Sequence, residues 1–364
     1  MINKLLIVFL LLKLFYFLQS VLSPYPEFNR MNLDYPGNYF LQVYSNNDSG
    51  FYEKIAENGY SKTTDINIDG ADYAFFPVYP FTGMLISKAF NISPRLSLLI
   101  VTTIASLLML IVFFSFVKEY LKDENKAFWC SLTLIFFPHH FYFSMIYTES
   151  FFLLSALLCY YSMLMKNNTI FIISSTILVL TRINGIFYLF PLLIFYNRDG
   201  IKNYLVISRY YIFIPMILSI LSYLTYLKIK FGSFLAFKIA SEKNWMGSPK
   251  NPIITLYETL LSTGNQEFLI YNAIYSIGFL ILSVIFITKR QYSFFLLSIL
   301  SILIPLYEGS SISQPRFISL IFPFSIIIGS FIYSFKYRKT LMIGLLLLHL
   351  ITFAFWNTTH PLSY

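Results

Sequence analysis

Long apolar runs alternate along the chain with short polar segments. The apolar runs lie at about 5–22, 96–117, 127–145, 149–165, 169–181, 185–196, 210–228, 268–288, 292–306, 317–335 and 340–355. A helix needs roughly 17–25 apolar residues to cross the hydrocarbon core of a bilayer. Because the runs are continuous rather than alternating, they do not fit the strands of a membrane barrel. The pattern predicts an all-α polytopic membrane protein with about eleven transmembrane helices, forming a single integral membrane domain over residues 1–364.

Two features modify this simple pattern. The runs between 127 and 196 are short, so we expect broken or tilted helices there, which a membrane protein tolerates where they line a protein-walled cavity. The first run, from Leu5 to Leu22 after Lys4, is long for a signal peptide and has no clear small-residue cleavage site. We therefore interpret residues 1–22 as an uncleaved first helix.

The composition agrees with a membrane protein. Hydrophobic residues make up 57% of the chain and charged residues 12%, and a soluble domain carries about 25% charged residues. The net charge of +9 would suggest nucleic-acid binding in a soluble protein, but here basic residues at cytoplasmic helix ends explain it, and we expect no nucleic-acid partner. Cys130 and Cys159 both lie in apolar runs, so we interpret them as small core residues.

The charges in the short loops give the orientation. With the N-terminus in the cytoplasm, the basic loop residues alternate correctly with the spans, which is the positive-inside pattern. These residues are Lys4, Lys118, Lys122, Lys126, Lys166, Arg198, Lys202, Arg209, Lys289, Arg290, Lys336, Arg338 and Lys339. Acidic residues show the opposite bias, since only Glu119, Asp123, Glu124 and Asp199 fall inside. A polar outer site that contains acids is one explanation for that bias.

Two outer segments are long, at 23–95 and 229–267, and loops above about 12–15 residues are usually functional or disordered. The first is rich in Tyr, Phe and Pro, which is atypical of disorder. Within it, the spacing of Phe51 and Ile55 predicts a short amphipathic helix over about 48–60 that lies at the membrane surface and ends at Gly59. A second surface element is expected after 75–80, where two prolines interrupt the helical pattern.

Asp48 stands at the start of this interfacial helix. A carboxylate there can accept a proton from a substrate hydroxyl at the membrane surface. The alternative is an ordinary helix N-cap, for which Asp is a favoured residue. Both interpretations stay open from the local sequence, because capping also fixes the side chain of a catalytic residue.

Two arginines lie near the outer face, where the positive-inside rule gives no reason for them. Arg182 stands in or beside an apolar run, and intramembrane charges are costly and usually functional. Arg316 opens a late span. A planar guanidinium suits a phosphate, so the two could hold a lipid phosphate. The alternatives are an ion pair of Arg182 with Glu149 and snorkelling of Arg316 at a helix end. Glu149 itself either orients a sugar or pairs with Arg182.

The remaining motifs give little support to other chemistries. His139 and His140 are adjacent, but a metal site needs further ligands at suitable spacing, and we expect no metal there. The chain contains no phosphate-binding P-loop, no serine-hydrolase elbow and no HExxH motif.

Six short motifs occur in the order found in the PIG-V-like mannosyltransferases, and the chain resembles that family over about residues 45–325. The motifs are Asp48–Tyr52 with Ile55–Tyr60, Ala74–Pro80, Tyr147–Ser150, Thr181–Gly185, Gly232–Phe237 with Trp245 after it, and Arg316–Phe317. One position departs from the family, because Asn47 stands where the family usually has Trp before the acid. This difference bears on the acceptor more than on the fold.

The resemblance implies a GT-C glycosyltransferase fold with a large first extracytoplasmic loop, and a polyprenyl- or dolichyl-phosphate sugar donor, often mannose. It implies Asp48 as the catalytic base, and it places Arg182 and Arg316 in matched motifs, where we expect them to bind the donor phosphate. We expect substrate contacts from residues of the same motifs: Tyr52, Tyr60, Tyr79, Tyr147, Glu149, Asn184 and Trp245. No cofactor is expected beyond the donor itself, and the acceptor would be a glycan or glycolipid.

The competing class is a transporter or a flippase for lipid-linked sugars, which would also explain many spans and an intramembrane arginine. It does not explain a long structured outer loop with an acid at a helix start. The length and the resemblance suggest a prokaryotic plasma membrane protein, or one of the endoplasmic reticulum if eukaryotic, with its active site on the extracytoplasmic side.

Overall fold

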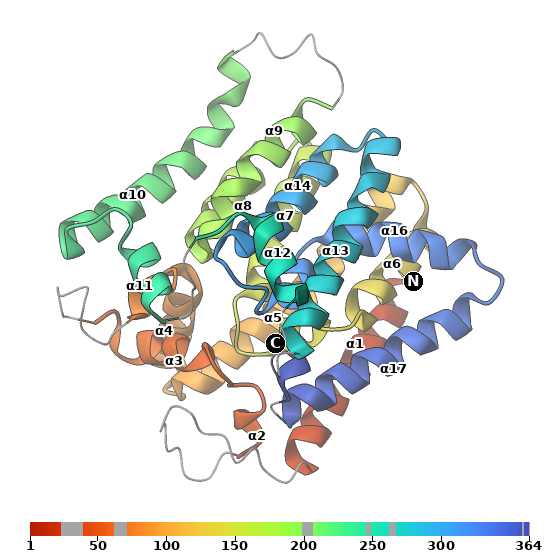
Figure 1. Cartoon of the computed structure of the whole chain (residues 1–364), viewed down its shortest axis with the longest axis horizontal. Helices are drawn as coiled ribbons and strands as arrows, with labels where there is room; N and C mark the ends of the chain where they lie inside the picture. Colours follow the sequence, from red (N-terminus) through yellow and green to blue (C-terminus); the bar gives the residue numbers. More distant parts are fainter. Residues whose placement is uncertain are drawn as a thin grey trace. The chain divides into compact units, whose positions relative to one another are not determined.

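The computed structural model describes residues 1–22, 39–61, 71–198, 207–244, 249–261, 267–358 and 360–363. Over these ranges the chain is helical and contains no strand (Figure 1). The contacts divide it into two compact units, each assembled from distant parts of the sequence. The first unit comprises Met1–Gly59, Val78–Leu157 and Phe322–Ser363, and the second comprises Tyr60–Pro77 and Leu158–Ile321. The single membrane domain over 1–364 stays a prediction.

The helices follow the predicted runs closely. Those of the first unit are α1 (Ile2–Leu22), α2 (Tyr39–Gln42), α3 (Ser49–Asn58), α4 (Val78–Phe90), α5 (Pro94–Leu121), α6 (Glu124–Phe136), η2 (His140–Ser144), the first half of α7 (Glu149–Leu164), α16 (Phe322–Ser334), α17 (Arg338–Asn357) and η6 (Pro361–Ser363). Those of the second are η1 (Ala71–Ala74), the rest of α7, α8 (Asn168–Thr181), η3 (Ile183–Tyr188), α9 (Leu189–Tyr196), η5 (Ile207–Phe213), α10 (Ile214–Phe231), α11 (Ala236–Asn244), α12 (Pro252–Leu261), α13 (Glu267–Thr288), α14 (Tyr292–Tyr307) and α15 (Gln314–Ser319).

Five of the described helical segments are long and apolar enough to cross a membrane: α1, α5, Tyr210–Phe231, α13 and α17. The other apolar helices are shorter, among them α7, α8, α14 and α16. The protein is therefore an all-α integral membrane protein, as the pattern predicted. The number of about eleven crossings stays a prediction.

The core of the first unit forms where α16 packs against α6 at close range (Figure 1). A Cβ atom on Gly329 of α16 would lie only 2.4 Å from Cα of Cys130 on α6, so glycine is what allows this approach. The Cys130 thiol is buried and lies 3.4 Å from the carbonyl oxygen of Ile326. Cys159 is also buried and free, which confirms both cysteines as core residues.

The helix α6 stops because of Pro138, and His140, two residues later, has a structural role at this break. Proline has no N–H, so the carbonyl of Leu134, four residues earlier, loses its helical donor. The Nδ1 atom of buried His140 donates to this carbonyl instead. The carbonyl of Phe137 accepts from Nδ1 of His349 on α17 at 2.9 Å. The break predicted for the short runs is thus real, and its freed backbone groups are satisfied by side chains.

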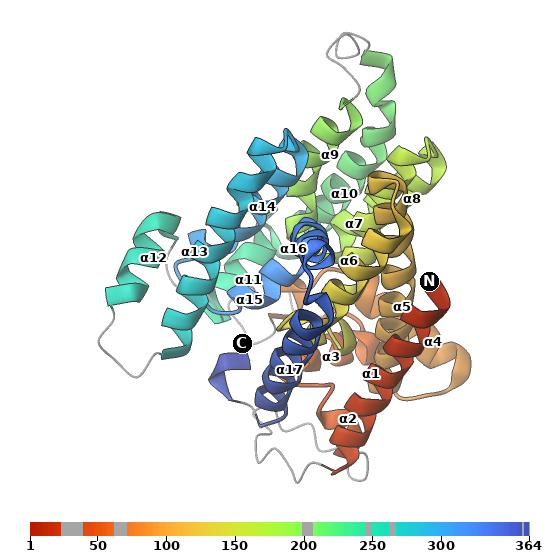
Figure 2. The ribbon, with the colours of Figure 1, turned by 90° about the vertical axis from the view of Figure 1, so that its right-hand side faces the viewer.

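The first and last long helices, α1 and α17, belong to the same unit and run beside each other (Figure 2). The ring centroids of Tyr16 on α1 and Phe353 on α17 lie 4.3 Å apart, and the Tyr16 hydroxyl hydrogen-bonds Nε2 of His349. In the second unit, α14 packs against α13, α9 and α15, and α8 against α10. The Ser293 hydroxyl of α14 donates to the carbonyl of Pro191 at 2.7 Å, which satisfies a carbonyl of the short helix α9.

We predict that His140→Ala lowers the free energy of unfolding by about 1–3 kcal/mol, because the Leu134 carbonyl then stays buried without a donor. His140→Asn, which keeps an N–H at a similar position, should recover most of this loss. Denaturant unfolding in detergent micelles measures both variants. Wild-type stability of His140→Ala would contradict this role.

Candidate functional site

In the first unit, the segment before the predicted base is held by its backbone carbonyls. Three donors from distant parts of this unit bind three carbonyls within four residues. The Trp356 indole donates to Val43 at 2.7 Å, the Ile146 amide to Tyr44 at 2.8 Å, and the Tyr147 hydroxyl to Asn46 at 2.8 Å. We refer to residues 43–46 as the clamped segment. It fixes the chain directly before α3.

Asp48 occupies the N-cap position of α3, as predicted, but its side chain makes no capping hydrogen bond to the helix. The side chain is half-buried. Asn47 before it has φ of +53°, a left-handed conformation for which Asn is among the favoured residues. The Asn at this position, where the resembled family has Trp, therefore suits a tight turn that presents Asp48. The Asp48 carboxylate is therefore not used for capping α3.

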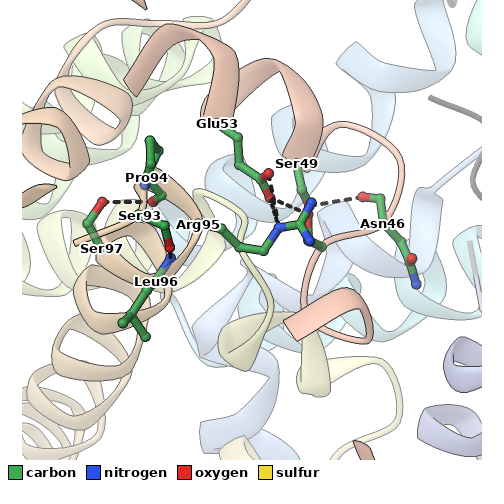
Figure 3. Close-up of polar contacts among 9 residues, drawn as sticks. Asn46, Ser49, Glu53, Ser93, Pro94, Arg95, Leu96 and Ser97 are labelled. Atoms are coloured by element: carbon green, nitrogen blue, oxygen red, sulfur yellow. Dashed lines mark hydrogen bonds and ion pairs between the residues drawn. The ribbon is translucent and has the colours of Figure 1, made fainter. Parts of the chain in front are cut away.

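A buried ion pair anchors α3 against the start of α5 (Figure 3). Nε of Arg95 lies 3.0 Å from each carboxylate oxygen of Glu53, and these residues are only 7% and 3% exposed. The Ser45 hydroxyl donates to the same carboxylate, which ties the clamped segment to the pair. Ser93 caps α5 by accepting from the Leu96 amide at 3.3 Å, so the arginine sits in a well-formed first helical turn.

The predicted substrate residues of the first unit are largely buried around this anchor. The Tyr52 ring packs edge-to-face on Tyr79, with centroids 5.1 Å apart, and the Tyr79 hydroxyl lies 2.8 Å from Thr102 Oγ1. Burial raises the pKa of Tyr79 well above its usual value, and the nearby carboxyl groups of Glu149 and Glu53 raise it further. Tyr147 and Glu149 are also fully buried, Glu149 at the start of α7.

In the second unit, Arg182 lies between α8 and η3 and has an extended backbone conformation, with φ of −153°. The chain can fold back here because of Gly185, where a Cβ atom would lie 2.5 Å from the carbonyl oxygen of Leu178. Glycine thus lets η3 pack directly on the backbone of α8 and fixes the position of the arginine. Asn184, in the same turn, is half-buried.

The two arginines expected at the donor phosphate are brought together. The guanidinium carbon of Arg182 lies 5.5 Å from the ring centroid of Phe317, and that of Arg316 lies 5.1 Å from the same centroid. Both distances are within the range of cation–π contact. The structure therefore places both guanidinium groups near the Phe317 ring. Arg316 comes from α15, and Arg182 follows the end of α8.

An acid and a third cation that sequence reasoning missed lie near these arginines. Glu308, directly after α14, interacts electrostatically with Arg182, Arg316 and Lys238 of α11. A buried amide also stands in α15: Gln314 is 0% exposed, and its side chain has no hydrogen-bond partner among the described residues. We refer to Arg182, Arg316, Lys238 and Glu308 as the charged cluster.

The other residues predicted to contact substrate are Tyr60 and Trp245. The Tyr60 hydroxyl donates to the Phe75 carbonyl at 2.5 Å and lies in the second unit. Trp245 lies outside the described residues. Asp48 and Glu149 belong to the first unit and Arg182 and Arg316 to the second, so a cavity that joins them, or an ion pair of Glu149 with Arg182, stays a prediction.

The sequence did contain a signal for the missed residues of the first unit. Arg95 is an arginine at an outer helix end, which is the argument that singled out Arg182. Its partner Glu53 was hidden because it lies on the helix α3 among residues of the expected surface element. No group of three or more His, Cys, Asp or Glu residues able to hold a metal occurs in the described part of the chain.

The fold is similar to that of a solved membrane-protein structure, ArnT. ArnT from Cupriavidus metallidurans, whose crystal structure was solved bound to undecaprenyl phosphate, matches with a TM-score of 0.59 and 12% identity. The match covers 93% of this chain and 62% of ArnT, so the chain spans less than two thirds of the ArnT length. The chain therefore shares the fold of ArnT, in agreement with the fold class that the resemblance implied.

An oligosaccharyltransferase from Archaeoglobus fulgidus, in complex with zinc and sulfate, matches more weakly, with a TM-score of 0.49 and 11% identity over 98% of this chain and 53% of that protein. No protein-family model matches the chain, and no curated protein matches it.

We predict that Arg95→Met lowers the free energy of unfolding by about 3–5 kcal/mol, because it leaves the Glu53 carboxylate buried without its cation. The double variant Glu53→Leu/Arg95→Met should be more stable than Arg95→Met, since it removes the charge as well. Lys88→Met, at an exposed lysine of α4, is the matched control. Equal stability of Arg95→Met and Lys88→Met in unfolding experiments would refute the anchor.

Proposed function

We propose that this protein is a glycosyltransferase that moves a sugar from a polyprenyl- or dolichyl-phosphate donor to a glycan or glycolipid. Mannose is the sugar that the family resemblance implies. The observation that carries the proposal is the GT-C-type fold, shared over 93% of the chain with ArnT, a protein that binds undecaprenyl phosphate. Arg182 and Arg316, which lie near the ring of Phe317, are the candidate phosphate site. We place the reaction on the extracytoplasmic side, in accordance with the charge pattern.

Each charged group has a distinct chemical role in this proposal. Arg182 and Arg316 hold the donor phosphate and stabilise the charge that it gains as the bond to the sugar breaks. Asp48 accepts the proton of the acceptor hydroxyl while the hydroxyl oxygen bonds to the anomeric carbon. The lipid phosphate leaves from the opposite face, so the anomeric configuration inverts. Guanidinium groups can neutralise a monophosphate leaving group, so the proposal requires no metal.

Tyr79 and Tyr147 have their hydroxyl groups engaged within the first unit. Tyr147 uses its hydroxyl on the Asn46 carbonyl, and Tyr79 uses its hydroxyl near Thr102. We therefore assign these two a positioning role. Tyr52, Tyr60, Glu149, Asn184 and Trp245 remain proposed substrate contacts.

We expect Asp48→Asn to lower the rate of sugar transfer by a factor of roughly 10²–10⁴, because the amide cannot take up the proton. The purified protein is assayed with polyprenyl-phosphate sugars in the absence of any ion gradient, a condition under which a transporter shows no transfer. Glu57→Gln, at an exposed acid of the same helix, should leave the rate unchanged. A fully active Asp48→Asn protein would remove Asp48 as the base.

Arg182→Ala should raise KM for the lipid donor roughly ten- to a hundredfold, which corresponds to losing a charge-assisted hydrogen bond of about 1.5–3 kcal/mol. Arg182→Lys should restore only part of the affinity, because an ammonium lacks the planar fork. Arg198→Ala is the control, since Arg198 stacks on Phe195 at 4.3 Å but lies on the predicted cytoplasmic side. Unchanged donor kinetics in Arg182→Ala would refute the phosphate role.

A further inference from the structure

Gln314 carries a fully buried carboxamide whose polar atoms are unsatisfied. Its side chain is 0% exposed, and neither Oε1 nor Nε2 has a hydrogen-bond partner in the described part of the chain. Burying an amide without hydrogen bonds costs free energy, and for this reason most buried polar side chains in folded proteins are paired. A ligand that supplies the missing hydrogen bonds would therefore be bound favourably at this position.

The carboxamide lies beside the proposed phosphate site. Gln314 is the first residue of α15, and Phe317 follows about one helical turn later, with its amide donating to the Ser313 carbonyl at 3.2 Å. Residues three apart on a helix are neighbours, with Cβ atoms about 5–6 Å apart. The Phe317 ring centroid lies 5.5 Å from the guanidinium carbon of Arg182 and 5.1 Å from that of Arg316. Gln314 is thus a helical neighbour of the ring that both arginines approach.

The backbone on both sides of Gln314 is fixed within the second unit. The Gln314 amide donates to the Ser311 carbonyl at 3.3 Å, and the buried Ser311 hydroxyl donates to the Leu269 carbonyl of α13 at 3.0 Å. Further along, the Ser319 hydroxyl donates to the Arg316 carbonyl at 2.6 Å. The helix α15 also packs against both α13 and α14. These contacts hold the carboxamide and Arg316 in a constant relation to each other.

The two unsatisfied atoms restrict the chemistry of the ligand. Nε2 donates hydrogen bonds and Oε1 accepts them, so a complete partner must both accept and donate. A phosphodiester accepts hydrogen bonds but donates none, and therefore it satisfies Nε2 at most. Neighbouring hydroxyl groups of a sugar ring accept and donate, so they can satisfy both atoms. In a polyprenyl-phosphate sugar the ring is bonded directly to a phosphate oxygen, so the sugar must lie close to whatever holds the phosphate.

We propose that Gln314 recognises the sugar of the lipid donor, with Nε2 donating to one ring hydroxyl and Oε1 accepting from the neighbouring one. This inference rests on the proposed function, because it adds a sugar-recognition residue to the same donor site. Gln314 contacts the sugar, whereas Arg182 and Arg316 hold the phosphate. Because the carboxamide is fully covered, a side chain around it must move as the sugar binds.

The test compares lipids that differ in the sugar but share one phosphodiester charge. The sugar-free probe is the methyl ester of undecaprenyl phosphate, and the hexose probes are undecaprenyl-phosphate mannose, glucose and galactose. Calorimetry measures their binding to the full-length protein in detergent. We expect the wild-type protein to bind at least one hexose lipid tenfold or more tightly than the methyl ester, as expected for about two additional hydrogen bonds.

The substitution Gln314→Met keeps the size and flexibility of the side chain but removes both polar atoms. It should raise Kd for the preferred hexose lipid roughly ten- to a hundredfold and leave Kd for the methyl ester unchanged. Gln291→Met, at the half-buried glutamine directly before α14, is the matched control and should bind both lipids as wild type does.

Stability separates sugar recognition from a structural role. The free energy of unfolding of Gln314→Met in detergent micelles should equal or exceed that of wild type, because the substitution removes buried polar atoms that lack partners. A Gln314→Met protein that is less stable than wild type or fails to fold would overturn the proposal.

The binding data distinguish the failure of this inference from the failure of the donor site. Wild-type protein that binds the hexose lipids no more tightly than the methyl ester would overturn the role of Gln314 while leaving the phosphate site intact. The same holds for a Gln314→Met protein that keeps the wild-type preference. Failure of the wild-type protein to bind any of these lipids would overturn the donor site itself.

Discussion

Apolar surroundings offer no water to a backbone carbonyl, so each carbonyl that a helix break releases must find a donor within the protein. This constraint explains much of the first unit. His140 supplies the donor that Pro138 lacks, and His349 donates to the carbonyl of Phe137. The clamped segment obeys the same rule, with an indole, an amide and a hydroxyl on three of its carbonyls. A loop held in this way can present a carboxylate such as Asp48 in one fixed position.

Glu53, which is buried, and Glu308, which is half-buried, illustrate different solutions to the cost of removing a carboxylate from water. Glu53 is fully paired with Arg95 and a serine hydroxyl, and it serves as an anchor. Burial raises the pKa of the Glu308 carboxyl group to about 7, although the nearby Arg182, Arg316 and Lys238 lower it. The Glu53–Arg95 pair holds α3 rigidly on α5, because separating the two residues would leave a buried charge without a partner. The second solution makes the carboxyl group harder to ionise than it is in water.

The sequence predicted the helical architecture well, because the length of each apolar run is a property of the local sequence. The short helix ending at Gly59 and the clustering of Arg182 with Arg316 were also predictable, the first from periodicity and the second from charges that violate the positive-inside rule. The partners of buried groups were not predictable. Glu53 and Arg95 lie 42 positions apart, and Trp356 and Val43 lie 313 apart. Nothing local indicates such pairs, since they arise only when distant segments pack. The side-chain role of the histidines was missed for the same reason.

The bond between Trp356 and Val43 has a consequence for how the protein is made. The segment that orients Asp48 is synthesised early, but one of its three donors arrives only with the last long helix. During synthesis, therefore, the Val43 carbonyl has no indole donor until α17 has been made. Order around the proposed base is consequently a late event in biogenesis, and a shortened chain without α17 would lack it.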